Sequence, residues 1–425
     1  MKKIKNERYK EEYVEETLDN GLHVVLWKKP EYEKSFFMMA TPLGALDIVQ
    51  SDEQGDLYEY PAGIAHFLEH KMFEMEDSDV MDEFSKLGAN VNAFTSYTET
   101  VYYFSTTNDP KKPLELLLDF VQTLSITDAS VEKEKGIIVE ELQMYQQMPD
   151  SRLLMETYTS LFHKHPLRYD IGGSEESVRS TTLQDLQNCY ERNYHPKNMV
   201  LVGVSAQDPE KLLTIIKENQ NKKTFKEQMK IKRLAVEEPI TPFRPYFKFS
   251  MDITAPKLSI SFKQKGIKDV RERLRKEWGI RLVLDALFSS LNPEFQSWID
   301  QGIINDFVGC DIDYGKDYGV LMFYGETSSQ DAFRDIVDHC VKKILSIQLD
   351  EEMIERLKRR YFGQTLRSLN SFDDIAISFV RSYFDGVDFF TSLEVLEAIS
   401  SSDIQEACQE LSMDQMSIVE VVPCA

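Results

Sequence analysis

Two histidines and a glutamate stand close together in the segment His66-Phe-Leu-Glu69-His70. On a helix, residues four apart lie one turn apart on the same face, so both imidazoles can reach a single ion. Glu69, three residues after His66, projects from the same side. A catalytic zinc site needs three protein ligands, an open position for water and a carboxylate that can take the proton of that water. The segment therefore predicts two ligands, His66 and His70, and a base, Glu69.

The alternative is a helix with two surface histidines and a solvated glutamate. The chain has only seven histidines, so we expect this spacing by accident in roughly one such chain in a hundred. The flanking side chains are mostly apolar and include Ile64, Phe67, Leu68, Met72 and Phe73. Charged groups on such a helix are costly to bury without a partner, which favours the metal site.

A third ligand has to come from elsewhere in the chain, and the segment 131–147 offers one. Glu141 is flanked at three and four positions by Ile137, Ile138, Met144 and Tyr145, which predicts that its side of a helix is buried.

Glu134 lies seven residues before Glu141, on nearly the same stripe. A divalent cation would satisfy two carboxylates placed there. We expect Glu141 to be the third ligand and Glu134 to orient a histidine or the bound water. The alternative is that either carboxylate pairs with a buried Arg or Lys.

The elements around these residues occur in one order, twice. The first half predicts strands at 22–27, 35–41, 90–96, 100–106 and 199–204, and helices at 63–73, 78–87, 114–124, 128–147 and 183–192. The second half predicts strands at 246–253, 258–262, 307–313, 320–325 and 417–422, and helices at 270–291, 293–301, 332–345, 351–366 and 403–411. The repeated order indicates a duplicated α+β fold, each half an antiparallel-rich sheet packed against helices.

The break between the two halves is expected near residue 230. The stretch 217–233 is basic and hydrophilic, and three prolines follow it at positions 239, 242 and 245. We predict a zinc-binding catalytic domain at 1–220, a linker at 221–245 and a homologous, non-catalytic domain at 246–425.

Composition excludes several classes of function. The net charge of -23 would repel nucleic acid, and no apolar stretch reaches the roughly eighteen residues that a membrane span needs. The first twenty residues are charged and contain no apolar run, which argues against a secretion signal. The five cysteines are odd in number and have no CxxC spacing, so neither disulfides nor a thiolate zinc site is expected. These features predict a cytoplasmic protein.

Several stretches together resemble a known family. They are 63–74 (GIAHFLEHKMFE), 88–96 (GANVNAFTS), 134–141 (EKGIIVEE), His165-Pro166 with Gly172-Gly173, and 194–199 (YHPKNM). The H-x-x-E-H order is that of the inverzincins. The chain resembles the pitrilysin/insulinase family of metallopeptidases, and it is most similar to the bacterial processing-peptidase-like members of the YmfH type.

The resemblance implies a zinc endopeptidase that holds one Zn2+ per chain and cleaves unfolded peptides or leader segments. It also implies that Asn92, Ala93, Phe94 and Thr95 lie on an edge strand to which the substrate adds as a further β-strand. For Phe94, a place in the core of an ordinary aromatic-rich strand is the alternative.

One departure from the family bears on partners. Complete family enzymes carry an Arg and a Tyr in a second, non-zinc half, and the matching segment here, 295–305, has neither. The resemblance then implies a split site in a heterodimer with a homologous inactive subunit that supplies both residues, although a homodimer is also compatible. The alternative function is a non-proteolytic scaffold or assembly subunit that keeps the peptidase fold. A structural zinc site is disfavoured, because such sites usually close with four ligands and use cysteine.

Overall fold

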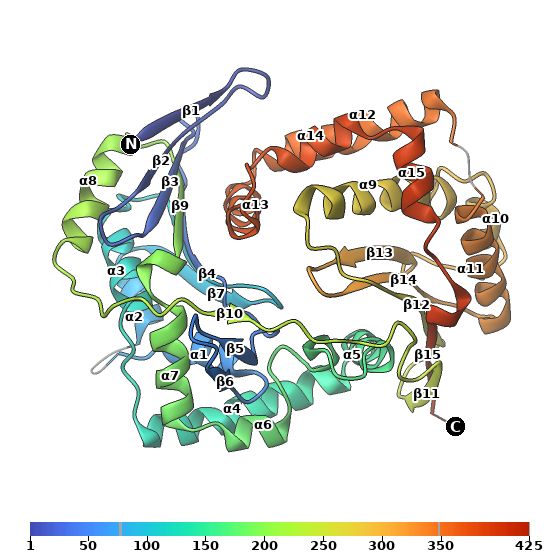
Figure 1. Cartoon of the computed structure of the whole chain (residues 1–425), viewed down its shortest axis with the longest axis horizontal. Helices are drawn as coiled ribbons and strands as arrows, with labels where there is room; N and C mark the ends of the chain where they lie inside the picture. Colours follow the sequence, from blue (N-terminus) through green and yellow to red (C-terminus); the bar gives the residue numbers. More distant parts are fainter. Residues whose placement is uncertain (76–78, 347–348, 425) are drawn as a thin grey trace. The chain divides into compact units, whose positions relative to one another are not determined.

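The computed structural model describes residues 1–75, 79–346 and 349–424 (Figure 1). Contacts divide it into two compact units. Unit 1 comprises residues 1–142, 170–234 and 366–386, and unit 2 comprises 143–169, 235–365 and 387–425. Both units therefore contain segments from both halves of the sequence. This spatial division differs in kind from the contiguous domains 1–220 and 246–425, which remain a prediction.

Unit 1 is built on a seven-stranded sheet with the order β1-β2-β3-β9-β4-β8-β7. Its strands are β1 (Lys2–Asn6), β2 (Glu11–Thr17), β3 (His23–Lys28), β4 (Ser35–Thr41), β7 (Ala89–Thr95), β8 (Thr100–Thr106) and β9 (Val200–Ser205). The pair β3–β9 is parallel and the other neighbours are antiparallel. A small second sheet contains β5 (Val49–Ser51), β6 (Leu57–Glu59) and β10 (Lys232–Arg233). Strand β7 is the last strand of the main sheet. One of its edges pairs with β8, and no described strand pairs with its other edge.

The helices of unit 1 lie on both faces of the main sheet. They are α1 (Ile64–Met72), α2 (Val80–Lys86), α3 (Lys111–Val121), α6 (Glu175–Ser180), α7 (Leu183–Asn193) and α8 (Pro209–Gln220), with most of α4 (Asp128–Gln147). Helices α1, α2, α3 and α8 pack on the sheet together with an apolar core that includes Phe67, Leu68, Phe84 and Tyr102. Helix α13 (Phe372–Asp385) covers the other face, against β9 and β4 (Figure 1).

Unit 2 repeats this plan with a five-stranded sheet of order β11-β15-β12-β14-β13. Its strands are β11 (Tyr246–Met251), β12 (Lys257–Gln264), β13 (Gly309–Tyr314), β14 (Gly319–Glu326) and β15 (Met416–Pro423). The pair β11–β15 is parallel and the rest are antiparallel, as in β3-β9-β4-β8-β7 of unit 1. The duplication read from the sequence is therefore confirmed at the level of sheet topology.

Helices complete unit 2 in the same manner. They are α9 (Val270–Leu287), α10 (Phe295–Asp300), α11 (Gln330–Ile344), most of α12 (Glu351–Ser368), α14 (Thr391–Ala398) and α15 (Ser401–Cys408). Helix α5 (Pro149–Leu161), from the first half of the sequence, packs on β15 and β12, as α13 packs on β9 and β4. Each unit thus contains one helix that comes from the other half of the sequence, α13 in unit 1 and α5 in unit 2.

All the expected elements are present, with bounds within four residues of those predicted, and some bounds match without deviation. The first residue of the helix expected at 78–87, Ser78, lies outside the described residues, and α2 begins at Val80. Several elements were not predicted: the strands β1, β2, β5, β6 and β10, and the helices α5, α6, α8, α13 and α14. Across the described ranges, no helix combines the length and the apolar character that crossing a membrane requires.

Candidate metal centre

Two glycines fix the start of the helix that carries the histidines. Gly63 precedes α1 with φ 87, a left-handed conformation that favours glycine. A Cβ on Gly63 would lie 2.2 Å from the carbonyl oxygen of Gly172, and one on Gly173 would lie 2.2 Å from that of Ala62. The two backbones therefore touch, and the loop at 172–173 holds the first turn of α1 in place.

Three of the predicted residues bring their ligand atoms together. Glu141 Oε2, on α4, lies 3.4 Å from His70 Nε2 and 3.8 Å from His66 Nε2, both on α1. One atom from each residue can be chosen so that all three lie within 4.8 Å of one another. Two imidazole nitrogens and one carboxylate oxygen form a donor set of the kind that catalytic zinc sites use. Donors about 3.3 Å apart are what four-coordinate bonding at about 2.0 Å requires, so the residues fit a zinc ion.

Glu134 lies behind His70, where the sequence placed a carboxylate that orients a histidine. Its Oε1 is 3.0 Å from His70 Nδ1. Its Oε2 is 3.6 Å from the Nζ of Lys71, a side chain that is only 4% exposed and that also pairs with Glu74. The two alternatives from the sequence therefore both occur at Glu134, which contacts a histidine and a buried lysine together.

The two histidines differ in their electrostatic surroundings. Burial, with His70 close by, lowers the pKa of His66 to about 4. Burial alone would lower the pKa of His70 as well, but hydrogen bonds with Glu134 and Glu141 outweigh it and raise that pKa to about 9. The hydrogen bond with His70 in turn lowers the pKa of Glu141. The two carboxylates therefore favour a positive charge at His70, whereas burial disfavours one at His66.

Glu69 is held by a residue from the edge strand. The hydroxyl of Thr95, at the end of β7, donates to Glu69 Oε2 at 2.6 Å. Burial raises the pKa of the Glu69 carboxyl, and the hydrogen bond from Thr95 opposes that rise. The resemblance implied a substrate contact for Thr95, and contact of its hydroxyl with Glu69 was not anticipated. Spacing along the chain carries no signal for a contact between a strand and a helix 26 residues apart.

The rest of the predicted substrate strand lies on the edge of the sheet. Asn92 Oδ1 accepts a hydrogen bond from the backbone N–H of Ala93 at 2.8 Å. Phe94 is half-buried and packs edge-on against Tyr103, with ring centroids 6.5 Å apart. The structure brings Thr95 to the site and places Asn92, Ala93 and Phe94 along the same strand.

One part of the sequence reasoning about Glu141 is wrong. Its neighbours were expected to be buried, yet Ile137, Met144 and Tyr145 are 44%, 52% and 40% exposed. Among the expected neighbours of Glu141, only Ile138 is buried, and it lies in the core together with Val131, Val139 and Leu142. These four side chains form the inner face of α4, and Glu141 lies at its border. That position lets the carboxylate reach the histidines of α1.

Comparisons with known proteins agree with this geometry. Residues 53–175 match the family model described as insulinase (peptidase family M16), and residues 180–361 match that of the peptidase M16 inactive domain. The chain is 36% identical to the zinc protease YmfH of Bacillus subtilis, covering 100% of this chain and 99% of that protein. It is 23% identical to the mitochondrial-processing peptidase subunit beta of Neurospora crassa, covering 96% and 87%.

Solved structures give the same result. The crystal structure of an M16-like peptidase from Alicyclobacillus acidocaldarius superposes with a TM-score of 0.93 at 34% identity, covering 97% of this chain and 99% of that one. A protease from Helicobacter pylori, at 17% identity and a TM-score of 0.83, shares the fold. The chain therefore belongs to the insulinase family of peptidases, family M16.

Proposed function

We propose that the chain is a zinc-dependent endopeptidase and the zinc-bearing subunit of a split-site heterodimer. The observation that carries the first part is the convergence of His66, His70 and Glu141 beside a half-buried carboxylate, Glu69, that is outside the ligand group. A metalloendopeptidase needs this separation, because the ligands bind the ion while a further carboxylate handles the proton.

In the proposed mechanism, His66, His70 and Glu141 hold the ion and Glu134 orients His70. A bound zinc ion supplies Lewis acidity, which activates water and polarises the scissile carbonyl. Glu69 accepts the proton of the attacking water and passes it to the leaving amine. The hydroxyl of Thr95 donates a hydrogen bond to Oε2 of Glu69, so we assign the proton taken from the water to Oε1. The hydrogen bond from Thr95 restricts the rotation of this carboxylate.

The substrate class follows from the edge strand. An extended peptide can pair with the free edge of β7 through main-chain hydrogen bonds, which bind many sequences with loose side-chain preference. In the structure the Asn92 side chain accepts a hydrogen bond from the N–H of Ala93. In this proposal Asn92 turns away from that N–H when a peptide pairs there. Unfolded peptides and leader segments meet the requirement for an extended main chain, whereas folded proteins do not.

The proposed partner is a homologous subunit without a zinc site. Segment 295–305, which forms α10 and the residues after it, contains neither the Arg nor the Tyr expected of a complete enzyme. A relative of this chain is a mitochondrial-processing peptidase subunit beta, a name that denotes one subunit of an assembly. We propose that a second chain supplies the Arg and the Tyr, and that a homodimer is the alternative assembly.

Zinc content and peptide cleavage, measured together, test this proposal. The purified chain is assayed against a library of internally quenched peptides, first alone and then mixed with a zinc-free homologue that carries the Arg and the Tyr. We expect about one zinc per chain and cleavage only in the mixture. Efficient cleavage by the chain alone would contradict the split site. Zinc without cleavage in either condition would instead favour a scaffold subunit.

A further inference from the structure

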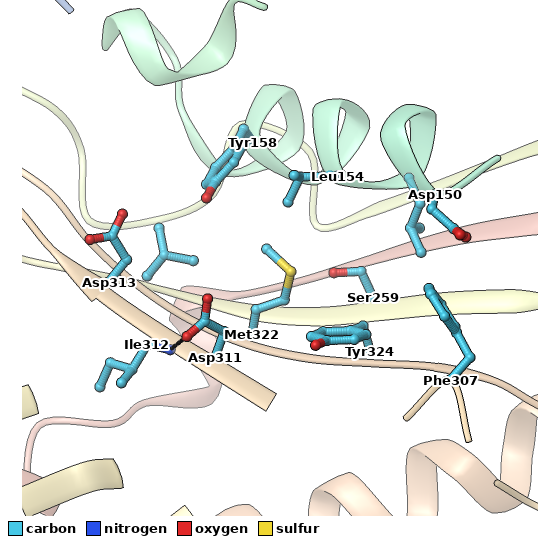
Figure 2. A pocket seen from close by; sticks show the side chains of 12 residues that line it. Asp150, Leu154, Tyr158, Ser259, Phe307, Asp311, Ile312, Asp313, Met322 and Tyr324 are labelled. Atoms are coloured by element: carbon cyan, nitrogen blue, oxygen red, sulfur yellow. Dashed lines mark hydrogen bonds between the residues drawn. The ribbon is translucent and has the colours of Figure 1, made fainter. Parts of the chain in front are cut away.

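Unit 2 contains a cavity of about 290 Å3 between α5 and the face of its sheet (Figure 2). Leu153 and Leu154 of α5 form one wall, and Val320 and Met322 of β14 form the opposite wall. All lining residues belong to unit 2. The zinc ligands and Glu69 are not among them, so the cavity is separate from the metal centre.

The duplication shows where this space comes from. Thr95 pairs with Thr100 in unit 1, and Tyr314 pairs with Gly319 in unit 2, each across a four-residue turn. Thr100 also faces Thr41, and Gly319 faces Gln264. Counting along the strands from these pairs aligns each residue of one sheet with a residue of the other.

At three aligned positions, unit 1 has aromatic rings and unit 2 has smaller or acidic side chains. The rings of Phe36 and Phe94 lie 5.4 Å and 6.5 Å from the ring of Tyr103. The register aligns Phe36 with Ser259, Tyr103 with Met322, and Phe94 with Asp313. All three unit 2 residues line the cavity. At these three positions, side chains without an aromatic ring line the cavity where unit 1 has rings.

Negative charge gathers at one end of the cavity. The carboxylates of Asp311 and Asp313 lie there beside the hydroxyl end of Tyr158, as Figure 2 shows. Asp313 accepts a hydrogen bond from Tyr318 at 3.2 Å, and Asp311 accepts one from the N–H of Ile312 at 2.8 Å. Asp311 also forms a long ion pair with Arg281, at 3.9 Å. Burial and these two carboxylates together raise the pKa of Tyr158.

The other end also contains an ion pair. Asp150 pairs with Lys257 at 2.9 Å, and the same Nζ lies 3.8 Å from the centre of the Phe307 ring. The ammonium group of Lys257 thus contacts an aromatic face and a carboxylate at the same time. The lining set, which consists of described residues, contains three aspartates and no lysine or arginine. A ligand with an apolar stem and a cationic head complements this lining.

We propose that the cavity binds the side chain of a lysine or arginine in an extended peptide segment. The aliphatic stem packs between Leu154 and Met322, and the cationic head reaches Asp311 and Asp313. Because β13 is the last strand of its sheet, a peptide that runs along this edge can insert one side chain beneath α5. The choice of a peptide as the occupant rests on the proposed function. The cation preference rests on the cavity alone.

Peptide binding to the full-length chain tests this inference. Two fluorescent ten-residue peptides of alanine and serine are compared, one with a single central arginine and one with norleucine at that position. Fluorescence anisotropy is recorded in EDTA, so that no cleavage interferes. We expect the arginine peptide to bind about tenfold more tightly, as one charge-assisted hydrogen bond allows.

Three variants make the result specific. Asp311→Asn with Asp313→Asn should remove the arginine preference. Met322→Tyr, which restores the ring found in unit 1, should weaken binding of the arginine peptide by filling the cavity. Asp306→Asn, an exposed aspartate outside the lining set, should keep the preference.

The unaltered chain and the first two variants also provide the contradicting results. Equal affinity of the unaltered chain for both peptides would overturn the inference, and so would a preference that persists in the double variant and in Met322→Tyr. Because the assay uses neither metal nor turnover, an arginine preference in a chain that cleaves nothing would contradict the proposed function and leave this inference standing.

Discussion

At the scale of single residues, the carboxylates around α1 have different surroundings, which suit one group to support the metal ligands and another to accept a proton. Glu134 and Glu141 both contact His70, whereas Glu69 is held by a neutral hydroxyl. A base that faced a cationic side chain would have its pKa lowered, and its affinity for a proton would fall. A hydroxyl donor positions the carboxylate without adding a further positive charge to that of His70.

The hydroxyl of Thr95 can be tested separately from its bulk. Thr95→Val keeps the shape of the side chain but removes the donor to Glu69. We expect kcat to fall about tenfold, as the loss of one hydrogen bond to a charged group predicts, with little change in KM. Thr95→Ser restores the donor and should recover most of the rate. A purely structural role would lower zinc content or thermal stability in both variants, and an unchanged kcat in Thr95→Val would contradict positioning.

Adjacent glutamates on α4 offer a matched pair for the third ligand. Glu141→Gln should lower zinc occupancy by more than tenfold, because an amide oxygen carries no charge to hold the ion. Glu140, the exposed neighbour, should tolerate the same change with full zinc content and activity. Zinc content is measured by elemental analysis after dialysis against a weak chelator. Equal zinc in the two variants would show that Glu141 is not a ligand.

The sequence predicted which residues meet at this site better than it predicted why. The i, i+4 histidines and the glutamates of segment 131–147 were singled out by type and spacing, and the structure brings them together. The expected burial around Glu141 was wrong, because helical periodicity alone did not show which stripe of α4 faces the core. The contacts of Thr95 and Lys71 depend on how elements pack in three dimensions, and a single sequence does not display that.

At the scale of elements, the exchanged helices α5 and α13 were missed although their local signals are clear. Helix α13 has a serine cap at Ser371, and its buried residues recur at helical spacing: Phe372, Ile375, Ala376, Phe379 and Val380. Strand β8, in contrast, was predicted with its observed bounds, because the segment is rich in aromatic and hydroxyl residues. What no local pattern indicates is that α13 covers one face of a sheet whose strands all come from the first half of the chain.

Truncating one side chain of α13 should therefore weaken unit 1. Phe379 is 6% exposed and packs edge-on against Tyr13 of β2, with ring centroids 5.7 Å apart. We expect Phe379→Ala to destabilise the protein by roughly 3–5 kcal/mol. Hydrogen exchange read by mass spectrometry should lose protection in β4 and β9, while Ser378→Ala, on the exposed side of α13, should not change it. Lost protection confined to residues 387–424 would contradict this packing.

A buried ion pair in unit 2 predicts a pH dependence. Glu238 accepts from Lys263 at 2.6 Å and also from the backbone N–H groups of His163 and Lys164. Burial alone would raise the pKa of Glu238, but these partners outweigh it and lower the pKa to about 2 from the ordinary 4.5. The ionised carboxylate therefore stabilises the fold above about pH 4.5, and this contribution is lost as the pH falls toward 2.

Replacing Glu238 checks the sign of this effect. Glu238→Gln should lower the free energy of unfolding by roughly 3 kcal/mol at pH 7, with the difference from the unaltered chain shrinking below pH 4.5. Urea unfolding from pH 7 to pH 3 measures this, with the exposed neighbour Glu237→Gln as the control. A difference that grows as the pH falls would show that the pair does not favour the ionised carboxylate.

At the scale of the whole molecule, the duplication provides two copies of one sheet that have diverged in chemistry. The strand orders β3-β9-β4-β8-β7 and β11-β15-β12-β14-β13 are the same. The metal cluster found among the described residues lies on α1 and α4. At matched positions where unit 1 packs aromatic rings, unit 2 has side chains that line a cavity, among them Asp313. Sequence order predicted the duplication, but the difference between the two sheets appears only when the registers of their strands are compared.

The central claim is that His66, His70 and Glu141 bind a catalytic zinc ion for which Glu69 is the base. Its most direct test is zinc content and single-turnover peptide cleavage of Glu69→Gln beside the unaltered chain, each mixed with the homologous subunit. We predict equal zinc, near one per chain, and a rate at least about a hundredfold lower in the variant. Full activity in Glu69→Gln, or active protein without zinc, would contradict the account.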